Sequence, residues 1–418
     1  MKEFWHSLTA DKMIALTVLV AALGYFVDGY DLVLFSVLRV ASLRDLGIAP
    51  EAMLDTGAYL LSMQLGGFLV GGLIWGVMGD RIGRKQVLFG SILLYSLANI
   101  ANAFVTDIGG YAVCRLLSGI GLAGEIGAGI TLVSELMPKK YRGYGTTVVA
   151  SVGVLGGAVA GFVGHMLHWQ AAYIVGGVMG LALLGLRVAV SESGMFKTVK
   201  EQAGVRRGDL RMLLRPDRFV RFVACILIAV PIWYAVAVLI TFAPEIGRAM
   251  HATGDIKAAT ALPFCYLGLT LGDFASGILS QRLQSRKKSL ALFMVFSALA
   301  VAVLLLQKGI APEIYYAFSF AIGVSMGYWV LMLTTSAEQF GTNLRATVAT
   351  GVPNFVRGAG VAITASFAAL KVYGVIASAA IVGAGCFALA FAALFVLRET
   401  FHTDLNFIED EREYQPTI

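Results

Sequence analysis

The chain has 418 residues, of which 58% are hydrophobic and only 14% are charged, and its mean hydropathy is +0.78. Soluble domains carry about one charged residue in four, so this composition excludes a soluble globular protein. The formal net charge of +6 does not indicate a nucleic-acid partner, because Lys and Arg gather at the cytoplasmic ends of membrane helices. The sequence therefore predicts an integral membrane protein.

Apolar stretches of about 20 residues recur along the chain, and each is long enough to cross a bilayer. They predict twelve membrane-spanning helices, at 13–38, 54–78, 86–105, 110–136, 144–167, 169–190, 219–247, 258–280, 288–307, 312–335, 346–370 and 373–397. Most Lys and Arg residues fall in segments that this arrangement puts on one side of the membrane, which predicts that both termini are cytoplasmic. The predicted fold class is an all-α membrane protein.

The first helix contains YFVDGYDLVLF, which places Asp28 and Asp31 inside the membrane. A charge at mid-depth costs roughly 2.5 to 3.5 kcal/mol on insertion scales. The two acids are three residues apart, so they share one helical face, and burial with mutual repulsion favours a bound proton. The pair is a candidate proton-coupling site. Alternatively, both acids form a structural bridge with Arg115, or Asp31 lies high enough to be hydrated.

The turn after the second helix reads GVMGDRIGRK. Gly76 and Gly83 permit close helix approach. Asp80 can accept hydrogen bonds from the amino end of a facing helix and from a basic partner, and such contacts break when helices separate. The alternative is that the charges only follow the cytoplasmic bias of basic residues, which explains Arg81 and Arg84 but not Asp80.

The fourth helix carries two charges at different depths. Arg115 begins the helix near its outer side, where it can pair with the first-helix acids or extend outward. Glu125 lies ten residues further, about 15 Å along the helix, and its glycine neighbours predict that it faces the bundle interior. Glu125 is expected to serve proton or substrate handling or, alternatively, a buried structural hydrogen bond. Glu135 and Arg142 follow at the inner end and form a candidate latch, with a solvated loop as the alternative.

The second half of the chain repeats features of the first about 200 residues later. GILSQRLQSR, from Gly277, echoes GVMGDRIGRK, and Glu338 and Arg345 repeat the spacing of Glu135 and Arg142. The predicted domains are an N-terminal six-helix bundle at 1–190, a cytoplasmic linker at 191–217, and a C-terminal six-helix bundle with a short cytoplasmic tail at 218–418. Two such halves fit a transporter that rocks around a site at the middle of the membrane.

Arg357, in PNFVRGAG, is predicted near the middle of the eleventh helix, about 18 Å from the inner edge. A buried guanidinium needs a partner, and its fork matches a carboxylate. Arg357 either pairs permanently with Asp273 or binds an anionic substrate. Aromatic residues at similar depth can hold a flat substrate body, although membrane-interface positions explain many aromatics. The candidate substrate-binding residues are Arg357, Asp273, Trp233, Tyr234, Tyr328, Trp329 and Asn354.

The sequence offers no sign of an enzyme. It contains no phosphate-binding GxxxxGK[ST] loop, so ATP hydrolysis within this chain is not expected. Neither a nucleophile with a paired base nor a metal-binding cluster is evident, so no metal or other cofactor is expected. The four cysteines fall singly in different predicted spans, which gives neither a metal pair nor a disulfide framework.

GDRIGRK after helix two, RLLSGIGLAGEIGAGITLVSELMPKKYRG through helix four, and the weaker copy in the second half resemble the major facilitator superfamily. Within it, DGYD, GEIGAG and SELMPKKYRG are most similar to the aromatic acid:proton symporters and related metabolite:proton symporters. The resemblance implies two pseudo-symmetric six-helix bundles and a gate at the GVMGDRIGRK turn that closes the inner face. The glycine pair in helix five differs from the motif of the drug:proton antiporters.

The expected function is proton-coupled import of a small organic anion, for example an aromatic acid, by alternating access. Its partners are then the substrate, protons and the lipid bilayer, and it is expected to act as a monomer in the inner membrane. Two alternatives stay open on the same fold: export, or transport of a neutral or sugar-like metabolite. A third is a receptor that binds a ligand without moving it.

Overall fold

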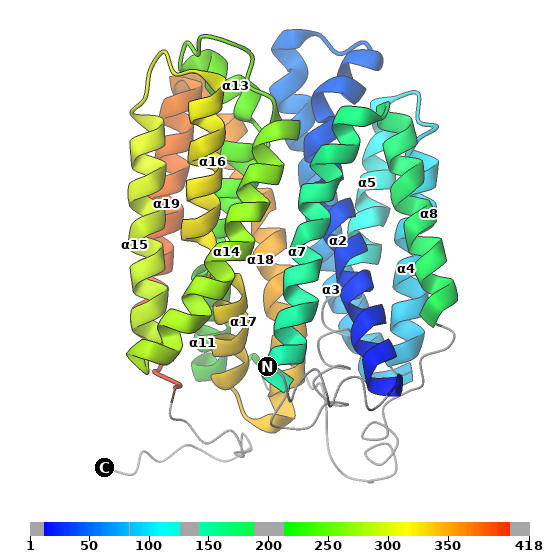
Figure 1. Cartoon of the computed structure of the whole chain (residues 1–418), viewed down its shortest axis with the longest axis vertical. Helices are drawn as coiled ribbons and strands as arrows, with labels where there is room; N and C mark the ends of the chain where they lie inside the picture. The colour runs from blue at the N-terminus through cyan, green and yellow to red at the C-terminus, as the bar shows by residue number, and fades with distance from the viewer. Residues whose placement is uncertain (1–11, 83, 126–141, 188–212, 402–418) are drawn as a thin grey trace.

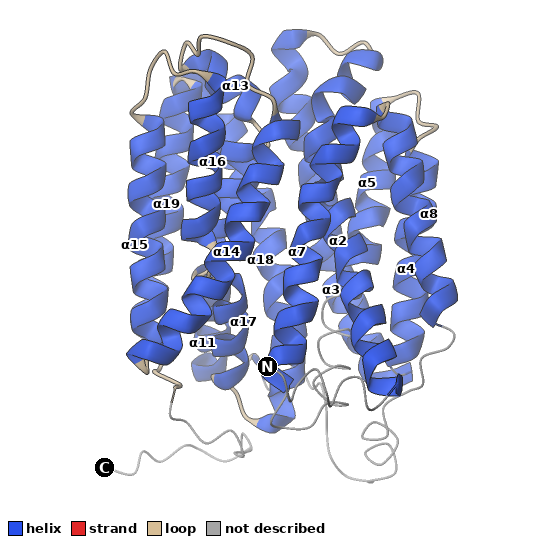
Figure 2. Cartoon of the chain, viewed as in Figure 1, coloured by secondary structure: helices blue, strands red, loops and turns tan. Residues whose placement is uncertain are grey.

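The computed structural model describes residues 12–82, 84–125, 142–187 and 213–401. The regular elements in these ranges are helices, and none is a strand (Figure 2). The helices lie roughly parallel and form two bundles side by side (Figure 1).

The first bundle forms the N-terminal half. Its elements are α2 (Lys12–Asp45), η1 (Pro50–Ala52), α3 (Met53–Ile82), α4 (Arg84–Asn102), α5 (Ile108–Leu122), α7 (Arg142–Met166) and α8 (Trp169–Arg187). Within it, α2 packs on α7 and α8, and α5 packs on α3 and α4.

The second bundle forms the C-terminal half. Its elements are α11 (Pro216–Leu227), α12 (Val230–Tyr234), η2 (Ala235–Ile240), α13 (Ala243–Ala249), α14 (Ala258–Leu283), α15 (Arg286–Leu305), α16 (Pro312–Met326), α17 (Trp329–Glu338), α18 (Thr342–Leu370), η3 (Lys371–Tyr373) and α19 (Val375–Val396). Helix α18 packs against α3 and helix α14 against α7, so these four helices carry most of the contact between the halves.

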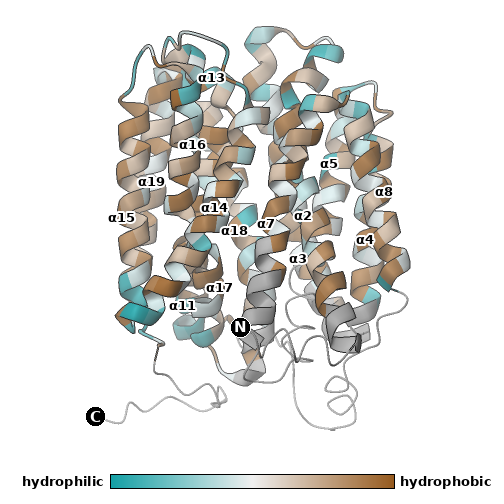
Figure 3. Cartoon of the chain, viewed as in Figure 1, coloured by the Kyte–Doolittle hydropathy of each residue, from teal (hydrophilic) through white to brown (hydrophobic). Residues whose placement is uncertain are grey.

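The described helices lie where the sequence predicts membrane spans. Nine segments of the described residues are long and apolar enough to cross a membrane. Three shorter apolar helices, Gln86–Asn102, Ile108–Leu122 and Val152–Met166, coincide with predicted spans three, four and five. Brown, hydrophobic residues recur along the helices, and teal, hydrophilic residues gather toward their ends (Figure 3). This distribution suits a bundle that lies in lipid. The boundaries predicted for the two domains and their linker stay predictions.

Two spans that the sequence presents as continuous are broken. The span predicted at 219–247 consists of α11, α12, the π-helical segment η2 and α13, with Pro231 in the first turn of α12. The span predicted at 312–335 is interrupted at Gly327 and Tyr328, between α16 and α17. Hydropathy does not reveal such breaks, because the residues remain apolar throughout. In transporters, broken helices at membrane depth line the central site.

Candidate functional site

An ion pair between the two halves occupies the centre of the molecule. Arg357 Nη2, on α18, donates to Asp28 Oδ2, on α2, at 2.9 Å, and both residues are almost fully buried. The guanidinium lies over the Phe68 ring, 4.7 Å from its centroid. Arg357 therefore pairs with Asp28, whereas the sequence had offered Asp273 as its permanent partner and Arg115 as the partner of Asp28.

This central ion pair is only partly satisfied. Within the described residues, Arg357 Nε and Nη1 have no hydrogen-bond partner, and neither has Asp28 Oδ1. A guanidinium has five N–H donors arranged as a fork that matches a carboxylate. Arg357 thus keeps donors for a second acceptor while it holds Asp28.

A small cavity lies beside this pair, where the halves meet. Its volume is about 40 Å³. It is lined by Tyr25, Gly29, Leu32, Gly153, Val154, Ile232, Trp233, Val236, Tyr266, Leu269, Trp329 and Arg357. Apart from Arg357 the lining is apolar or aromatic, and it comes from both halves. A ligand there would touch the two bodies that have to move relative to each other.

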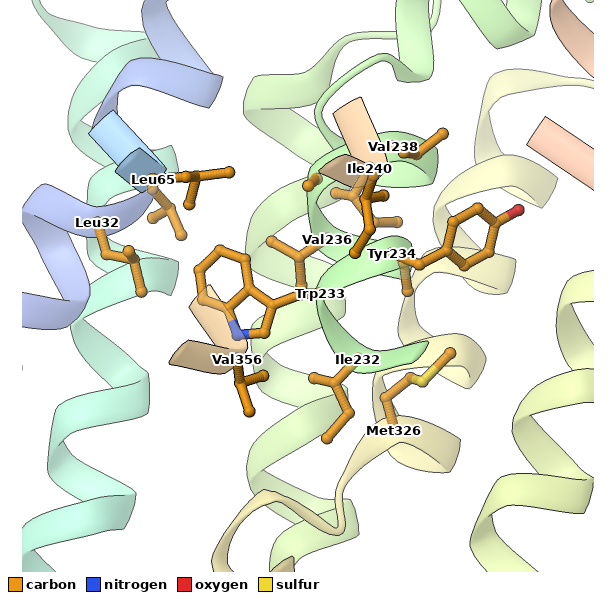
Figure 4. Packing of buried hydrophobic residues seen from close by; sticks show 14 of the residues in the cluster. Leu32, Leu65, Ile232, Trp233, Tyr234, Val236, Val238, Ile240, Met326 and Val356 are labelled. Atoms are coloured by element: carbon orange, nitrogen blue, oxygen red, sulfur yellow. The ribbon is translucent and has the colours of Figure 1, made fainter. Parts of the chain in front are cut away.

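Trp233 and Tyr234 are adjacent in sequence but face opposite ways. The Trp233 ring points toward Leu32 and Leu65 of the N-terminal half, and Tyr234 points away into the C-terminal half (Figure 4). The Tyr234 hydroxyl donates to the Ala379 carbonyl at 2.7 Å. The Tyr328 hydroxyl similarly donates to the Ile228 carbonyl at 3.1 Å. Of the four predicted aromatic residues, Trp233 and Trp329 line the cavity, and the two tyrosines lie outside it.

Two further predicted substrate residues hold helices in place. Asp273 Oδ1, on α14, accepts from the Val330 backbone N–H at 3.1 Å, in the first turn of α17. The Asn354 amide, on α18, donates to the Ala123 carbonyl at 2.9 Å and so joins the halves. Neither residue lines the cavity. The sequence did not single out Tyr25 and Tyr266, which do line it; their membrane depth was the only available signal.

The Asp31 side chain points into a different part of the protein from the Asp28 side chain. It is fully buried, and a Cβ on Gly176 of α8 would collide with its Oδ1, so the carboxylate points into the N-terminal half. Arg115 lies in its electrostatic environment but is not within ion-pair distance. Instead, Arg115 Nη2 donates to Asn99 Oδ1 at 2.8 Å, and Asn99 lies beside Asp31. Asp28 therefore faces the C-terminal half, and Asp31 faces the interior of its own N-terminal half.

Glu125 forms a buried ion pair with Arg187, the last described residue of α8. Arg187 Nη1 donates to Glu125 Oε2 at 3.1 Å, and Nη2 donates to Oε1. Gly24 of α2 lies directly against both side chains. Glu125 faces the bundle interior, as its glycine neighbours predicted, and its partner comes from the same half.

A second ion pair joins the halves at the end of the molecule that carries α13, at the top of Figure 1. Arg39 Nη1 and Nη2, on α2, donate to the two carboxylate oxygens of Glu245, on α13, at 2.8 Å each. Arg39 also donates to the carbonyls of Met53 and Thr241, each at 3.2 Å. Both side chains are buried. The sequence analysis missed this pair, because Arg39 follows the predicted span and reads as an outer-edge residue.

The predicted gating residues are described only in part. Gly83 and Glu135 lie outside the described residues. For six more of these residues, the structure describes the backbone as helical but not the side-chain environment. These are Gly76, Asp80, Arg81, Arg84, Arg142 and Arg345. Glu338 accepts from Arg286 Nη2 at 3.1 Å and from Thr400 Oγ1 at 2.7 Å, so its described partners belong to its own half.

Among the described residues, no group of three or more His, Cys, Asp and Glu side chains is placed to hold a metal ion. The four cysteines are free. The described groups at the centre include the Arg357 guanidinium, the Asp28 carboxylate and the aromatic rings of the cavity.

Two membrane bundles that meet at a central, partly satisfied ion pair and a small aromatic cavity define a two-domain membrane transporter. A sequence profile of the Major Facilitator Superfamily matches residues 21–365. The chain belongs to this superfamily, and it is a transporter rather than an enzyme.

Curated relatives and solved structures agree with this class. The chain is 28% identical to the 3-(3-hydroxy-phenyl)propionate transporter of Escherichia coli strain K12, over 82% of this chain and 85% of that protein. It is 24% identical to the gentisate transporter of Corynebacterium glutamicum, over 77% and 73%. Its fold is similar to the xylose transporter of E. coli in an inward-open conformation, with a TM-score of 0.71, 16% identity, and coverage of 94% and 98%. This last likeness concerns the fold alone.

Proposed function

We propose that the protein imports a small carboxylate-bearing compound with an aromatic ring, driven by protons and by alternating access. The observation that carries this proposal is the incomplete bonding of Arg357 at the wall of an aromatic cavity between the halves. A substrate carboxylate can accept from Nε or Nη1, and its ring can lie against Trp233, Trp329 and the two cavity tyrosines. Such a site joins a charged anchor to a flat apolar wall.

The relatives support this substrate class. Hydroxyphenylpropionate and gentisate, which the names of two relatives give as their substrates, each combine an aromatic ring with a carboxylate. The cavity of about 40 Å³ is far smaller than the 300 Å³ or more of typical ligand sites. The substrate therefore enters only after the halves move apart.

Asp28 and Asp31 are the proposed proton-coupling acids, with Arg115 and Glu125 as charged neighbours. When Asp28 is ionised it occupies one edge of Arg357 and competes with an anionic substrate for the same cation. Protonation of Asp28 weakens that competition and frees the cation. Substrate binding and proton binding then favour each other, which is the linkage that symport requires.

The proposed gates lie at the two ends. We assign the closed outer gate to the Arg39–Glu245 pair and retain the inner gate at the turn containing Asp80, with Glu135, Arg142 and Arg345. The protein is proposed to act as a monomer in the inner membrane, with both termini in the cytoplasm.

A binding screen tests the substrate class. Purified protein is titrated with benzoate, 4-hydroxybenzoate, 3-(3-hydroxyphenyl)propionate and, as a neutral comparison, xylose. We expect the acids to bind and xylose not to bind. The acid that binds best is then used in proteoliposomes, where an inward proton gradient should drive its accumulation. Binding of xylose alone would favour the neutral-metabolite alternative, and accumulation driven only by an outward-directed exchange would favour export.

A further inference from the structure

Several buried polar groups lie inside the N-terminal half, away from the cavity. Asp31 Oδ1 and Oδ2, the Tyr95 hydroxyl and the Ser96 hydroxyl have no hydrogen-bond partner within the described residues. All three residues are fully buried. Buried polar atoms in folded proteins are normally bonded to protein or to ordered water, and in a membrane the cost of leaving them unsatisfied is several kcal/mol. A cluster of such atoms is therefore a site for water.

One face of α8 arranges these groups in order. Gly176 lies against Asp31 Oδ1, and Gly180, one turn further, lies against the Ser96 hydroxyl and the Tyr95 ring. Arg187 follows seven residues later on the same face and holds Glu125. From Gly176 to Arg187 the helix rises about 16 Å. The order along the helix is Asp31, then Tyr95 with Ser96, then Glu125.

Helix α2 gives an independent measure of the same path. Gly24 lies against the Glu125–Arg187 pair, and Asp31 is seven residues away on the same helix face. The two carboxylates are thus separated by about 10 Å along α2, which is too far for direct transfer but short enough for one hydroxyl and water. Tyr95, on α4, is in electrostatic range of both Asp31 and Glu125.

Tyr30 and Tyr173 are titratable groups that lie near Asp31, in addition to the charged groups around this path. Asp31 faces Arg115 of α5 and Asp28 of its own helix. Glu125 faces Arg187 of α8 and, at longer range, Asp28. Asp28, by contrast, is committed to Arg357 across the interface.

We propose that a proton bound at Asp31 leaves toward the cytoplasm through the interior of the N-terminal half, by way of the Tyr95 hydroxyl and water to Glu125, and not through the substrate cavity. The inference rests on the proposed function, because it assumes proton-driven transport. Asp31 gives its proton to a water molecule and is left ionised. That water and the Tyr95 hydroxyl each accept one proton and donate another, so their proton number does not change. Glu125 accepts the last proton through water and then releases it to inner water, which leaves its carboxylate ionised. No oxidant or cofactor takes part.

Tyr95→Phe tests the route, because it removes one hydroxyl and leaves the ring. The matched control is Tyr315→Phe, which also removes a buried hydroxyl but lies in the C-terminal half, where that hydroxyl donates to the Leu239 carbonyl at 2.6 Å. Both variants are reconstituted with the best-binding acid of the screen above, and internal pH is followed with trapped pyranine. We expect Tyr95→Phe to slow gradient-driven uptake and the accompanying proton flux on the order of 100-fold, the scale of a lost proton-transfer group. Counterflow and substrate affinity should stay unchanged, and Tyr315→Phe should behave like the wild type.

Unchanged gradient-driven uptake in Tyr95→Phe would overturn the route. A second variant, Glu125→Gln with Arg187→Gln, removes the receiving acid without leaving a buried charge, and it should show the same loss with counterflow retained. The wild type separates the two proposals. If the wild type does not accumulate the acid with a proton gradient, the proposed function fails. If the wild type, Tyr95→Phe and the Glu125→Gln, Arg187→Gln double variant all accumulate it, only the route fails.

Discussion

Two of the ion pairs that connect the halves of this transporter are buried, and they are built differently. At the α13 end, Arg39 makes four hydrogen bonds, two of them to Glu245 in a bidentate arrangement. At the centre, Arg357 makes one hydrogen bond within the described residues, to Asp28, and both its Nε and Nη1 lack a partner there, whereas of the Arg39 nitrogens only Nε lacks one. Both cations are buried and both lie over a phenylalanine ring. The difference therefore lies in how many acceptors each cation is given.

The contrast indicates two uses for the same chemistry. A buried pair with bidentate geometry and additional backbone acceptors resists separation, because removal of either partner leaves an unpaired charge. A buried pair with spare donors can exchange its acceptor without leaving the cation alone. The Arg39–Glu245 pair suits closure, and the Arg357–Asp28 pair suits exchange with a substrate carboxylate.

The largest expected effect comes from breaking the outer pair on one side. In Arg39→Met, Glu245 stays buried and loses its bidentate partner, with Arg248 Nη2 at 4.0 Å as the remaining cation; removal of one partner of a buried pair destabilises typical proteins by about 3–5 kcal/mol. We expect the outer face to open, so that a cysteine at Ser36 becomes reactive toward a membrane-impermeant maleimide. Ser36 is buried and its hydroxyl accepts from Thr241 at 2.9 Å, so the closed state protects it.

The double variant Arg39→Met with Glu245→Leu is the control for that prediction. It removes both charges, so thermal stability should recover, while the maleimide reactivity of the Ser36 cysteine should stay raised because the polar latch is gone. A protected cysteine in both variants would show that the pair does not close the outer face.

Arg357→Lys tests the role of the central Arg357–Asp28 pair in substrate binding. Lysine keeps the charge but loses the fork, so the affinity for an acidic substrate should fall by about 1.5–3 kcal/mol, the range for hydrogen bonds to charged groups. Isothermal titration with the best-binding acid measures this change. Wild-type affinity in the variant would reduce Arg357 to a structural role.

Asp28→Asn tests whether the central acceptor carries the coupling. Asparagine can still accept from Arg357 but cannot bind and release a proton. Substrate affinity should change by less than tenfold, about 1.4 kcal/mol, while accumulation against a gradient is lost and counterflow continues. Asp31→Asn is expected to lose accumulation in the same way. If both single variants accumulate substrate normally, the two acids are not the coupling site.

The smallest effect is expected at an exposed pair near the outer pair. Lys371 contacts Asp55 across the halves, but both side chains are substantially exposed to the surroundings. Exposed ion pairs contribute about 0.2–1 kcal/mol. Lys371→Met should therefore leave the maleimide reactivity of the Ser36 cysteine close to the wild-type value, and a strong rise in that reactivity would place part of the closure here.

The sequence predicted the helices well because hydropathy and length decide which segments cross a bilayer. It also identified Asp28 and Arg357, since charges at membrane depth are expensive and need a reason. The sequence could not predict that these two residues pair, because they are 329 positions apart and several carboxylates lie at a similar membrane depth to Arg357. Arg39 was not singled out because it follows the apolar stretch that marked the first span, whereas α2 continues to Asp45.

The aromatic residues show a second limit. Trp233 and Tyr234 share depth and composition, yet adjacent positions on a helix point about 100° apart, and only one can face the cavity. The apolar sequence also does not predict that α12 ends at Tyr234 and that a π-helical segment follows. Depth in the membrane can be predicted from hydropathy, but direction around a broken helix depends on packing.

Asp273 is a position at which mutation is expected to change substrate selectivity. It lies outside the cavity and accepts the Val330 N–H in the first turn of α17, directly beside Trp329, whose ring lines the cavity. A residue that holds the start of a helix also sets the direction of the first side chains on that helix. Substitutions at Asp273 should therefore shift which ring sizes the cavity prefers, so substrate choice can be changed from a position outside the cavity lining.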